Sequence, residues 1–307
     1  MRPFSGWVIL DKPLGLGSTQ AVGATKRNVR EGGYAKTKVG HGGTLDPLAT
    51  GVLPIALGEA TKLCGRMLDA TKIYEFTIGF GTQTDTLDLE GAVVETSDAR
   101  PTLEAVQAVL PDFTGPIEQV PPKYSAIKVD GKRAYALARS GEEVVMKKRA
   151  VEILSLKVDE TSQQAAQNDG DGLNEVTLIA HVSKGTYIRS LARDIAFAAG
   201  SVGHVTMLRR TKAGPFDLSH AISLDKLNEM GQSAALEDVI LPIEAGLDDI
   251  PALSLTPDQA GRIRNGQVLV GIIADDGQYL ARDDNDVPVA LVALLDGEVR
   301  VIRGFNL

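Results

Sequence analysis

A single aspartate, Asp46, stands in a loop whose residue types suit a catalytic carboxylate. It belongs to the run Gly43-Thr-Leu-Asp-Pro-Leu-Ala49, with further glycines and apolar residues on both sides. Glycine lets a backbone turn sharply and approach a ligand closely, and Pro47 biases the residue before it away from a helix. A carboxylate on such a loop is a candidate nucleophile or general base. The alternative, on the loop alone, is a turn aspartate that caps a helix or bonds its own backbone.

The composition is that of a globular protein. The chain has 307 residues, of which 43% are hydrophobic and 23% charged, and this length corresponds to about two domains. It lacks a run of roughly 18 apolar residues, which a membrane-spanning helix needs, and its first residues do not resemble a signal peptide. One cysteine and four scattered histidines form neither a disulfide framework nor a metal-site spacing. We therefore expect a cytoplasmic protein with no membrane association and no bound metal.

Charge is unevenly distributed along the chain. The net charge is −8, but residues 213–307 hold 16 acidic and 6 basic residues, which leaves +2 for residues 1–212. Residues 121–150 carry eight Lys or Arg against three Asp or Glu, and residues 184–212 carry six against one. Basic stripes on an acidic chain are typical of a polyanion-binding surface. Charge alone still favours the simpler interpretation, in which these stripes are solvated helix faces.

The elements that must position Asp46 are predicted from hydrophobic periodicity. Alternation over Lys72–Phe80 indicates a strand with Tyr74 on the same face as Phe76, Ile78 and Phe80. Further strands are predicted at 7–10, 51–57 and 176–182, and helices at 18–30, 59–68, 103–110 and 186–199. Strands and helices alternate without a regular βαβ rhythm. We predict an α+β fold with a mixed, largely antiparallel sheet flanked by helices.

The chain is expected to divide near residue 247. Residues 1–246 form the larger domain, and residues 247–307 form a small β-rich domain with a helix at 257–264 followed by four short strands. Two segments interrupt the larger domain. Residues 121–150 are basic and weakly patterned, as in a mobile arm, and residues 160–174 are polar, as in a disordered loop.

Five ordered motifs resemble those of the bacterial TruB family, the tRNA pseudouridine synthases that modify uridine 55 of the T loop. One motif is the Asp46 loop in its full length, His41-Gly-Gly-Thr-Leu-Asp-Pro-Leu-Ala-Thr-Gly51. The other four, in the family's order, are Asp11-Lys-Pro13; Lys72-Ile-Tyr-Glu-Phe76 with Gln83-Thr-Asp-Thr-Leu-Asp-Leu-Glu-Gly91; Pro122-Lys-Tyr-Ser-Ala-Ile-Lys128 with Gly131-Lys-Arg-Ala-Tyr135; and Ser183-Lys-Gly-Thr-Tyr-Ile-Arg189 with His204 to Arg210. The resemblance runs from about residue 5 to residue 216, and more weakly to the C-terminus.

The resemblance implies a pseudouridine-synthase core with a small PUA-like C-terminal domain. The reaction detaches uracil from its ribose, rotates the base and rejoins it through C5, so it implies no cofactor. By resemblance Asp46 is the nucleophile and Arg189 is the cation that keeps it ionised, with a planar fork that suits a carboxylate bidentately. From helix spacing alone, Arg189 would be a surface residue on the same face as Arg193. Tyr74 is the residue on which the target base stacks, and it helps to remove the C5 proton. Whether Asp46 attacks the ribose or the base, or promotes elimination at the sugar, stays open.

The same resemblance assigns substrate contacts outside the catalytic group. Tyr187 is a second pocket tyrosine and Leu208 lines the uracil pocket. His41 takes the place of the flipped base in the RNA loop. Lys12 shapes the active site, and Lys184 belongs to the motif that carries Tyr187.

The basic insertion resembles the segment that closes over the T arm of tRNA. Its cations are expected to contact phosphates, with an affinity that falls as salt rises. The C-terminal domain resembles the one that meets the acceptor stem, although its acidic residues outnumber its basic ones here. We expect tRNA as the partner, no obligatory protein partner, and a monomer. The phosphate contacts are assigned to Lys123, Lys128, Lys132, Arg133, Lys147, Lys148 and Arg149.

Two other functions compete with this hypothesis. A glycoside hydrolase needs a second carboxylate as acid or base; Asp85 and Asp88 are available, but they carry no glycosidase signature. The stronger alternative is a non-catalytic tRNA-binding or tRNA-folding module that uses the same surface.

Overall fold

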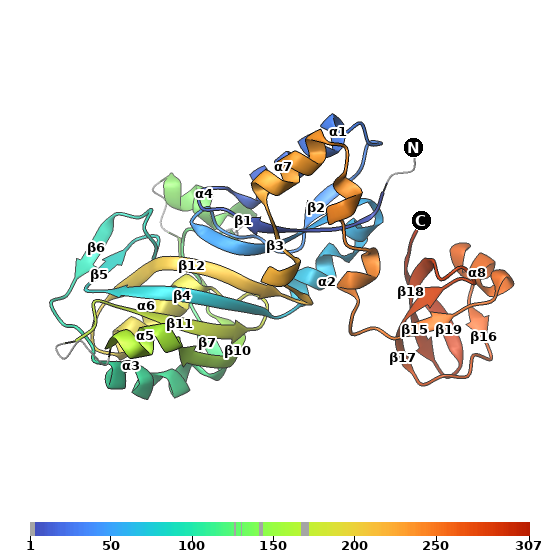
Figure 1. Cartoon of the computed structure of the whole chain (residues 1–307). Coiled ribbons are helices and arrows are strands. Elements are labelled where there is room, and N and C mark those ends of the chain that lie inside the picture. The colour runs from blue at the N-terminus through green and yellow to red at the C-terminus, as the bar shows by residue number, and fades with distance from the viewer. Residues whose placement is uncertain (1–3, 126, 130, 141–143, 167–171) are drawn as a thin grey trace.

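The computed structural model contains a large β-sheet and a second, smaller one (Figure 1). It describes residues 4–125, 127–129, 131–140, 144–166 and 172–307. The large sheet follows the order β14 (Ile222–Ser223), β1 (Gly6–Lys12), β3 (Ala49–Leu57), β12 (Gly203–Ala213), β4 (Lys72–Phe80), β11 (Glu175–Val182), β10 (Arg149–Val158) and β7 (Gly115–Gln119). Two short strands also belong to this sheet. β2 (Val39–His41) pairs with β3, and β13 (Phe216–Asp217) pairs with β12.

The pairing within this sheet confirms the predicted fold class. It is antiparallel except between β1 and β14 and between β3 and β12. The parallel pair brings Leu208 of β12 opposite Ala49 of β3. Because the Asp46 loop (residues 43–49) ends at Ala49, this register fixes the loop beside β12. The antiparallel pair on the other side of β12 sets Leu208 against Phe76 of β4.

Helices cover the sheet in two groups (Figure 1). Helix α1 (Ser18–Glu31) packs against α7 (Leu224–Gln232), and both rest on apolar residues of β1 and β3. Helix α6 (Ile188–Ala198) and helix α3 (Leu103–Val109) pack together beside β4 and β11. The Thr102 side chain caps α3 by accepting the N–H of Ala105 at 3.2 Å. No helix among the described residues is long and apolar enough to cross a membrane.

The C-terminal part forms its own β-rich domain. The smaller sheet has the order β15 (Ala252–Ser254), β17 (Gly277–Arg282), β18 (Pro288–Leu295), β19 (Glu298–Gly304) and β16 (Leu269–Val270), with α8 (Pro257–Arg264) packed against it. It touches the larger sheet's domain through a 3-10 turn at Gly58–Leu63. There Lys62 donates to the carbonyl of Gly304 at 2.8 Å, and Glu59 accepts the N–H of Asn306 at 2.8 Å.

Two expectations about local structure need correction, and a third segment has short elements that were not predicted. The polar segment at 160–174 is not a loop throughout, because α5 (Glu160–Ala166) forms within it; residues 167–171 lie outside the described part. The Asp159 carboxylate starts α5 by accepting the N–H groups of Thr161 and Ser162 at 3.0 and 3.4 Å. The helix predicted at 59–68 is a 3-10 turn followed by α2 (Cys64–Asp69). The basic insertion has local order in β8 (Lys128–Val129), β9 (Lys132–Arg133) and α4 (Ala134–Arg139).

Candidate active site

The Asp46 loop is held from both sides by buried hydrogen bonds. The Ser18 hydroxyl, at the start of α1, donates to the carbonyl of Leu45 and accepts its N–H, both at 2.8 Å. From β12, the Arg210 guanidinium donates to the carbonyls of Gly43 at 3.1 Å and Thr44 at 3.3 Å. Gly43 has φ +144°, a left-handed conformation that favours glycine. The loop is therefore a fixed platform for the Asp46 carboxylate.

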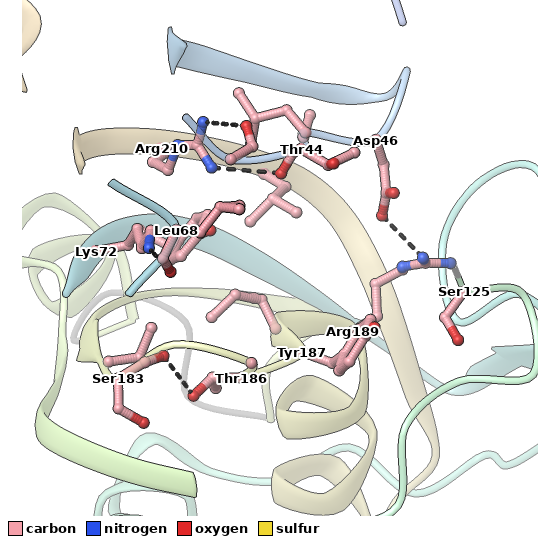
Figure 2. Close-up of a pocket in the computed structure, with 18 residues that line it drawn as sticks. Thr44, Asp46, Leu68, Lys72, Ser125, Ser183, Thr186, Tyr187, Arg189 and Arg210 are labelled. Carbon is pink, nitrogen blue, oxygen red and sulfur yellow. Dashed lines mark hydrogen bonds and ion pairs between the residues drawn. The ribbon is translucent and has the colours of Figure 1, made fainter. Parts of the chain in front are cut away.

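The Asp46 carboxylate points at Arg189, in the first turn of α6 (Figure 2). Arg189 Nη2 lies 2.8 Å from Asp46 Oδ2. The two side chains differ in burial, because Arg189 is 7% exposed and Asp46 is 44% exposed. An open carboxylate beside a buried, fixed guanidinium can meet an incoming ligand while its charge stays compensated.

Arg189 also binds a second carboxylate that the sequence hypothesis did not give it. Arg189 Nη1 lies 3.1 Å from Asp88 Oδ2 and donates to the carbonyl of Thr86 at 2.9 Å. The guanidinium fork is therefore shared between Asp46 and Asp88, in place of the expected bidentate grip on Asp46. Asp88 is itself fixed, since its Oδ1 accepts the Thr86 hydroxyl at 2.5 Å and the N–H of Glu90 at 3.0 Å. The sequence signal for Asp88 was its place in the 83–91 motif.

The Asp46–Arg189 pair lines a cavity of about 290 Å³ whose walls mix aromatic, apolar, polar and charged side chains. Tyr74, Tyr187 and Leu208 all line it, so the structure brings these predicted residues together. Tyr74 and Leu208, both partly buried, each pack against two of the hydrophobic clusters of the larger domain. Burial raises the pKa of the Tyr187 phenol, which keeps it protonated. The cavity therefore sets two aromatic rings and an apolar side chain close to the Asp46 carboxylate.

A second cavity of about 800 Å³ shares the Asp46–Arg189 pair with the first. His41 lines this second cavity and does not line the first. Burial, together with the charge of Arg210, lowers the pKa of His41. Its Nδ1 accepts the N–H of Gly43 at 3.4 Å. The Asp46–Arg189 pair thus lines both cavities, with Tyr74, Tyr187 and Leu208 in the first and His41 in the second.

Comparison with known families decides the relationship. The model of the TruB family pseudouridylate synthase N-terminal domain matches residues 31–188, and that of the tRNA pseudouridylate synthase B C-terminal domain matches residues 189–248. The chain belongs to the TruB family. This confirms the family predicted from the five motifs.

Relatives and structures agree with this family. The chain is 64% identical over 303 residues to tRNA pseudouridine synthase B of Novosphingobium aromaticivorans, covering 98% of this chain and 97% of that protein. It is 55% identical over 301 residues to the protein of the same name from Zymomonas mobilis subsp. mobilis, covering 98% and 96%. Among solved structures, a chain of an H/ACA RNP bound to a substrate RNA containing 2'-deoxyuridine has a TM-score of 0.69 at 23% identity, covering 98% of this chain and 85% of that one. At that identity the likeness concerns the fold.

Besides His41, two predicted contact residues of this TruB-family chain, Lys12 and Lys184, lie outside the 290 Å³ cavity. Lys12, at the end of β1, is fully buried and donates to the carbonyls of Pro13, Leu16 and Pro47 at 3.1, 2.6 and 3.2 Å. Burial lowers its pKa to about 8. It therefore ties the Asp46 loop to β1, which fits a shaping role better than a substrate contact. Lys184 is exposed and pairs with Asp69 at 2.8 Å, beside the cavity.

The basic insertion lies at the surface of this TruB-family chain. Lys123, Lys132 and the run at 147–149 are exposed, and Lys148 lies 3.6 Å from Glu118. The side chains of Lys128 and Arg133 fall outside the described part of the structure. In the described ranges, no group of three or more His, Cys, Asp or Glu side chains is arranged to hold a metal ion.

Proposed function

We propose that this pseudouridylate synthase isomerises uridine to pseudouridine in the T loop of tRNA, at position 55, with Asp46 as the nucleophile. The observation that carries the proposal is the Asp46–Arg189 pair in a cavity lined by Tyr74, Tyr187 and Leu208. Family membership supplies the reaction class, and the relatives named tRNA pseudouridine synthase B supply the tRNA substrate.

The substrate base must leave the RNA loop before it can reach Asp46. Extruding a base costs a few kcal/mol of lost stacking, and stacking on an aromatic side chain recovers about 1–3 kcal/mol. Tyr74 and Tyr187 offer that stacking inside the cavity. His41 lies in the neighbouring cavity, across the Asp46–Arg189 pair. It is placed to occupy the position in the RNA loop that the base has left.

The isomerisation exchanges one bond to the ribose for another. The bond from N1 to C1′ breaks with its electron pair on N1, uracil turns, and C5 bonds to C1′. The C5 proton leaves and N1 takes up a proton, so atoms and electrons balance without a redox partner. Asp46 assists by adding to C1′, by adding to C6 of the base, or by promoting elimination at the sugar. Each route needs the Asp46 carboxylate at the reacting atoms, and Arg189 Nη2 holds that carboxylate at 2.8 Å. In this proposal Tyr74, which lines the cavity, takes part in removing the C5 proton.

RNA binding would depend on local basic surface. The insertion at 121–150 lies next to the second cavity, because Tyr124, Ser125 and Tyr135 line it. Its exposed cations can meet phosphates of the T arm. We further propose that the chain acts on tRNA as a monomer, without an obligatory protein partner. The C-terminal domain would meet the acceptor stem with little help from charge, since its acidic residues exceed its basic ones.

Replacing Asp46 by Asn tests the nucleophile assignment. The variant keeps the side chain's shape and removes its charge, so it should bind unmodified tRNA and form no pseudouridine. Chemical mapping of pseudouridine in the product tRNA is the measurement, with filter binding as the control for affinity. Modification at the wild-type rate by the variant would refute the role of Asp46. If wild-type protein bound tRNA and modified none of its uridines, the non-catalytic RNA-binding alternative would hold instead.

A further inference from the structure

Two buried cations line the active-site cavity on the side away from Arg189 (Figure 2). Arg210 is 1% exposed and Lys72 is 7% exposed. Among the described residues, neither lies within ion-pair distance of a carboxylate; their hydrogen bonds go to backbone carbonyls. A buried cation without a counter-ion is costly, and such costs are concentrated at functional sites. The cavity is therefore built to receive negative charge.

The strand register places these cations beside the surface on which the base would stack. Arg210 of β12 stands opposite Tyr74 of β4 in the antiparallel ladder. Side chains at opposed positions have Cβ atoms about 5 Å apart. Lys72 precedes Tyr74 by two residues, so both project from the same face of β4. Leu208 precedes Arg210 by two residues on β12. A ring stacked on Tyr74 would lie between Leu208 and Arg210.

The other cation of the site cannot serve as a free positive charge. Arg189 is shared by two carboxylates, Asp46 and Asp88, so that cluster is negative in sum. It compensates Asp46 and attracts no further anion. Among the described residues, Arg210 and Lys72 are the cations lining this cavity that make no ion-pair contact, and Asp69 acts on Lys72 only from beyond ion-pair distance.

The reaction puts negative charge on the uracil by every route open to Asp46. If C1′ is attacked, or if the sugar undergoes elimination, the N1–C1′ bond breaks with its electron pair on N1, and the uracil anion spreads that charge over O2 and O4. If Asp46 adds to C6, the ring electrons move to O4. We propose that Arg210, reinforced by Lys72, stabilises the negative charge that develops on the uracil ring. The proposal rests on the proposed function, and it does not depend on which atom Asp46 attacks.

Both cations are fixed before the substrate arrives, which makes them effective at a developing charge. A guanidinium carries five N–H donors. Three of those of Arg210 bond the carbonyls of Val52, Gly43 and Thr44, which leaves two for the cavity. Lys72 is different, because its three N–H groups all bond carbonyls at the end of α2, those of Met67, Leu68 and Ala70. Lys72 therefore acts through its charge alone.

The competing interpretation is that Arg210 only positions the Asp46 loop through its bonds to Gly43 and Thr44. Three variants separate the two roles. Arg210→Lys keeps the charge and loses the fork, whereas Arg210→Gln keeps donors and loses the charge. Lys72→Gln lowers the charge without touching the loop. The matched control is Arg209→Gln, on the same strand, whose side chain pairs with Asp11 outside the cavity.

The experiment measures single-turnover pseudouridine formation on an unmodified tRNA transcript, with enzyme in excess, and tRNA affinity by filter binding. Arg210→Gln should lower the rate constant about 100-fold, with affinity unchanged. Lys72→Gln should lower it by less, and Arg210→Lys should be faster than Arg210→Gln. Arg209→Gln should match wild type. Thermal melting of each variant verifies that it is folded.

A transcript with 5-fluorouridine at the modified position gives a second test that folding defects cannot imitate. Fluorine withdraws electrons and stabilises the uracil anion, so the substrate depends less on the protein's charge. With 5-fluorouridine, the rate of substrate consumption by wild type divided by that of Arg210→Gln should therefore be smaller than the same ratio measured with uridine. The same should hold for Lys72→Gln. A ratio as large as with uridine would overturn the proposal, as would Arg210→Lys being as slow as Arg210→Gln. A loss confined to affinity would instead make these cations ground-state phosphate contacts and would also overturn it. If wild-type protein forms no pseudouridine, the proposed function fails first, which is a distinct result.

Discussion

Replacing Asp88 by Asn should slow catalysis although Asp88 does not line the 290 Å³ cavity. Asp88 Oδ2 lies 3.1 Å from Arg189 Nη1, and both side chains are buried, at 10% and 7% exposed. Asparagine keeps the shape and can still accept from Thr86 and Glu90, but it removes the charge that draws one end of the guanidinium away from Asp46. We expect Arg189 to shift toward Asp46 and to tighten on it, which makes the nucleophile less available.

The magnitude follows from the burial of the pair. Removing one partner of a fully buried ion pair costs about 3–5 kcal/mol. Here Arg189 keeps Asp46 as a counter-ion and Asp46 is 44% exposed, so solvent screens part of the loss. A loss of about 1–3 kcal/mol remains, of the size expected for one hydrogen-bonded charged group. If between half and all of this free energy is lost from the transition state, the rate constant drops about 2- to 160-fold, since 1.36 kcal/mol is a factor of ten.

The assay is single-turnover pseudouridine formation, together with tRNA affinity and thermal melting. Asp283→Asn is a matched control, because Asp283 is also 10% exposed and pairs with an arginine, Arg264, at 2.6 Å in the C-terminal domain. Both variants should melt below wild type, and only Asp88→Asn should be slow. Equal rates for Asp88→Asn and wild type would refute the reasoning that the shared fork tunes Asp46. Equal slowing by the control would show that the effect reflects general destabilisation.

Two further predictions concern salt and pH. Changing the basic run at 147–149 to Ala should weaken tRNA binding and make its salt dependence shallower by about one unit of slope per lost phosphate contact; an unchanged slope in a salt titration would remove this run from the binding surface. Raising the pH from about 8 to about 9 should slow the reaction while it raises thermal stability, because burial, with the charge of Arg210, lowers the pKa of Lys72 to about 8. In that window the unfolded chain binds more protons than the folded one, so stability rises with pH, whereas the cavity loses positive charge. The pKa of Lys12 is also lowered to about 8, so Lys12 loses its charge over the same pH range. Lys72→Arg keeps its charge at pH 9 and should therefore restore part of the rate there. Rate and stability profiles that rise together would contradict the prediction.

The strands and helices around the site were predictable because their signals are local. Alternation from Lys72 to Phe80 fixed β4 and its faces, and α8 over Pro257–Arg264 has a capping box at Thr256 and a proline in its first turn. Residues 160–166 show where composition misleads, since a single carboxylate, that of Asp159, starts a helix in a polar segment. Helix capping depends on two or three particular residues, so the average polarity of a segment does not reveal it.

The partners of Arg189 show what a single sequence leaves open. The motifs brought Asp46 and Arg189 together, but the contact between Arg189 and Asp88 joins residues 101 positions apart. The buried state of Arg210 was also beyond prediction, because arginine is mostly exposed unless something in the fold requires otherwise. That requirement is the position of β12 between β3 and β4, which is a property of the whole sheet.

The net charge that residues 1–212 present to solvent differs from the net charge counted from their sequence, because several of their cations are buried. Residues 1–212 have a net charge of +2 by sequence. Among the described residues of this range, four cations and one acid are buried: Lys12, Lys72, Arg189, Arg210 and Asp88. Leaving out these five buried charges, the remaining side chains of residues 1–212 carry a net charge of −1. Buried cations can act on a base within the cavity, but their side chains cannot make direct contacts with phosphates of an RNA backbone that stays outside it. Under the proposed function, the phosphate contacts then fall to exposed cations, and the 121–150 insertion, with eight Lys or Arg against three Asp or Glu, would supply a larger share of them than the overall composition indicates.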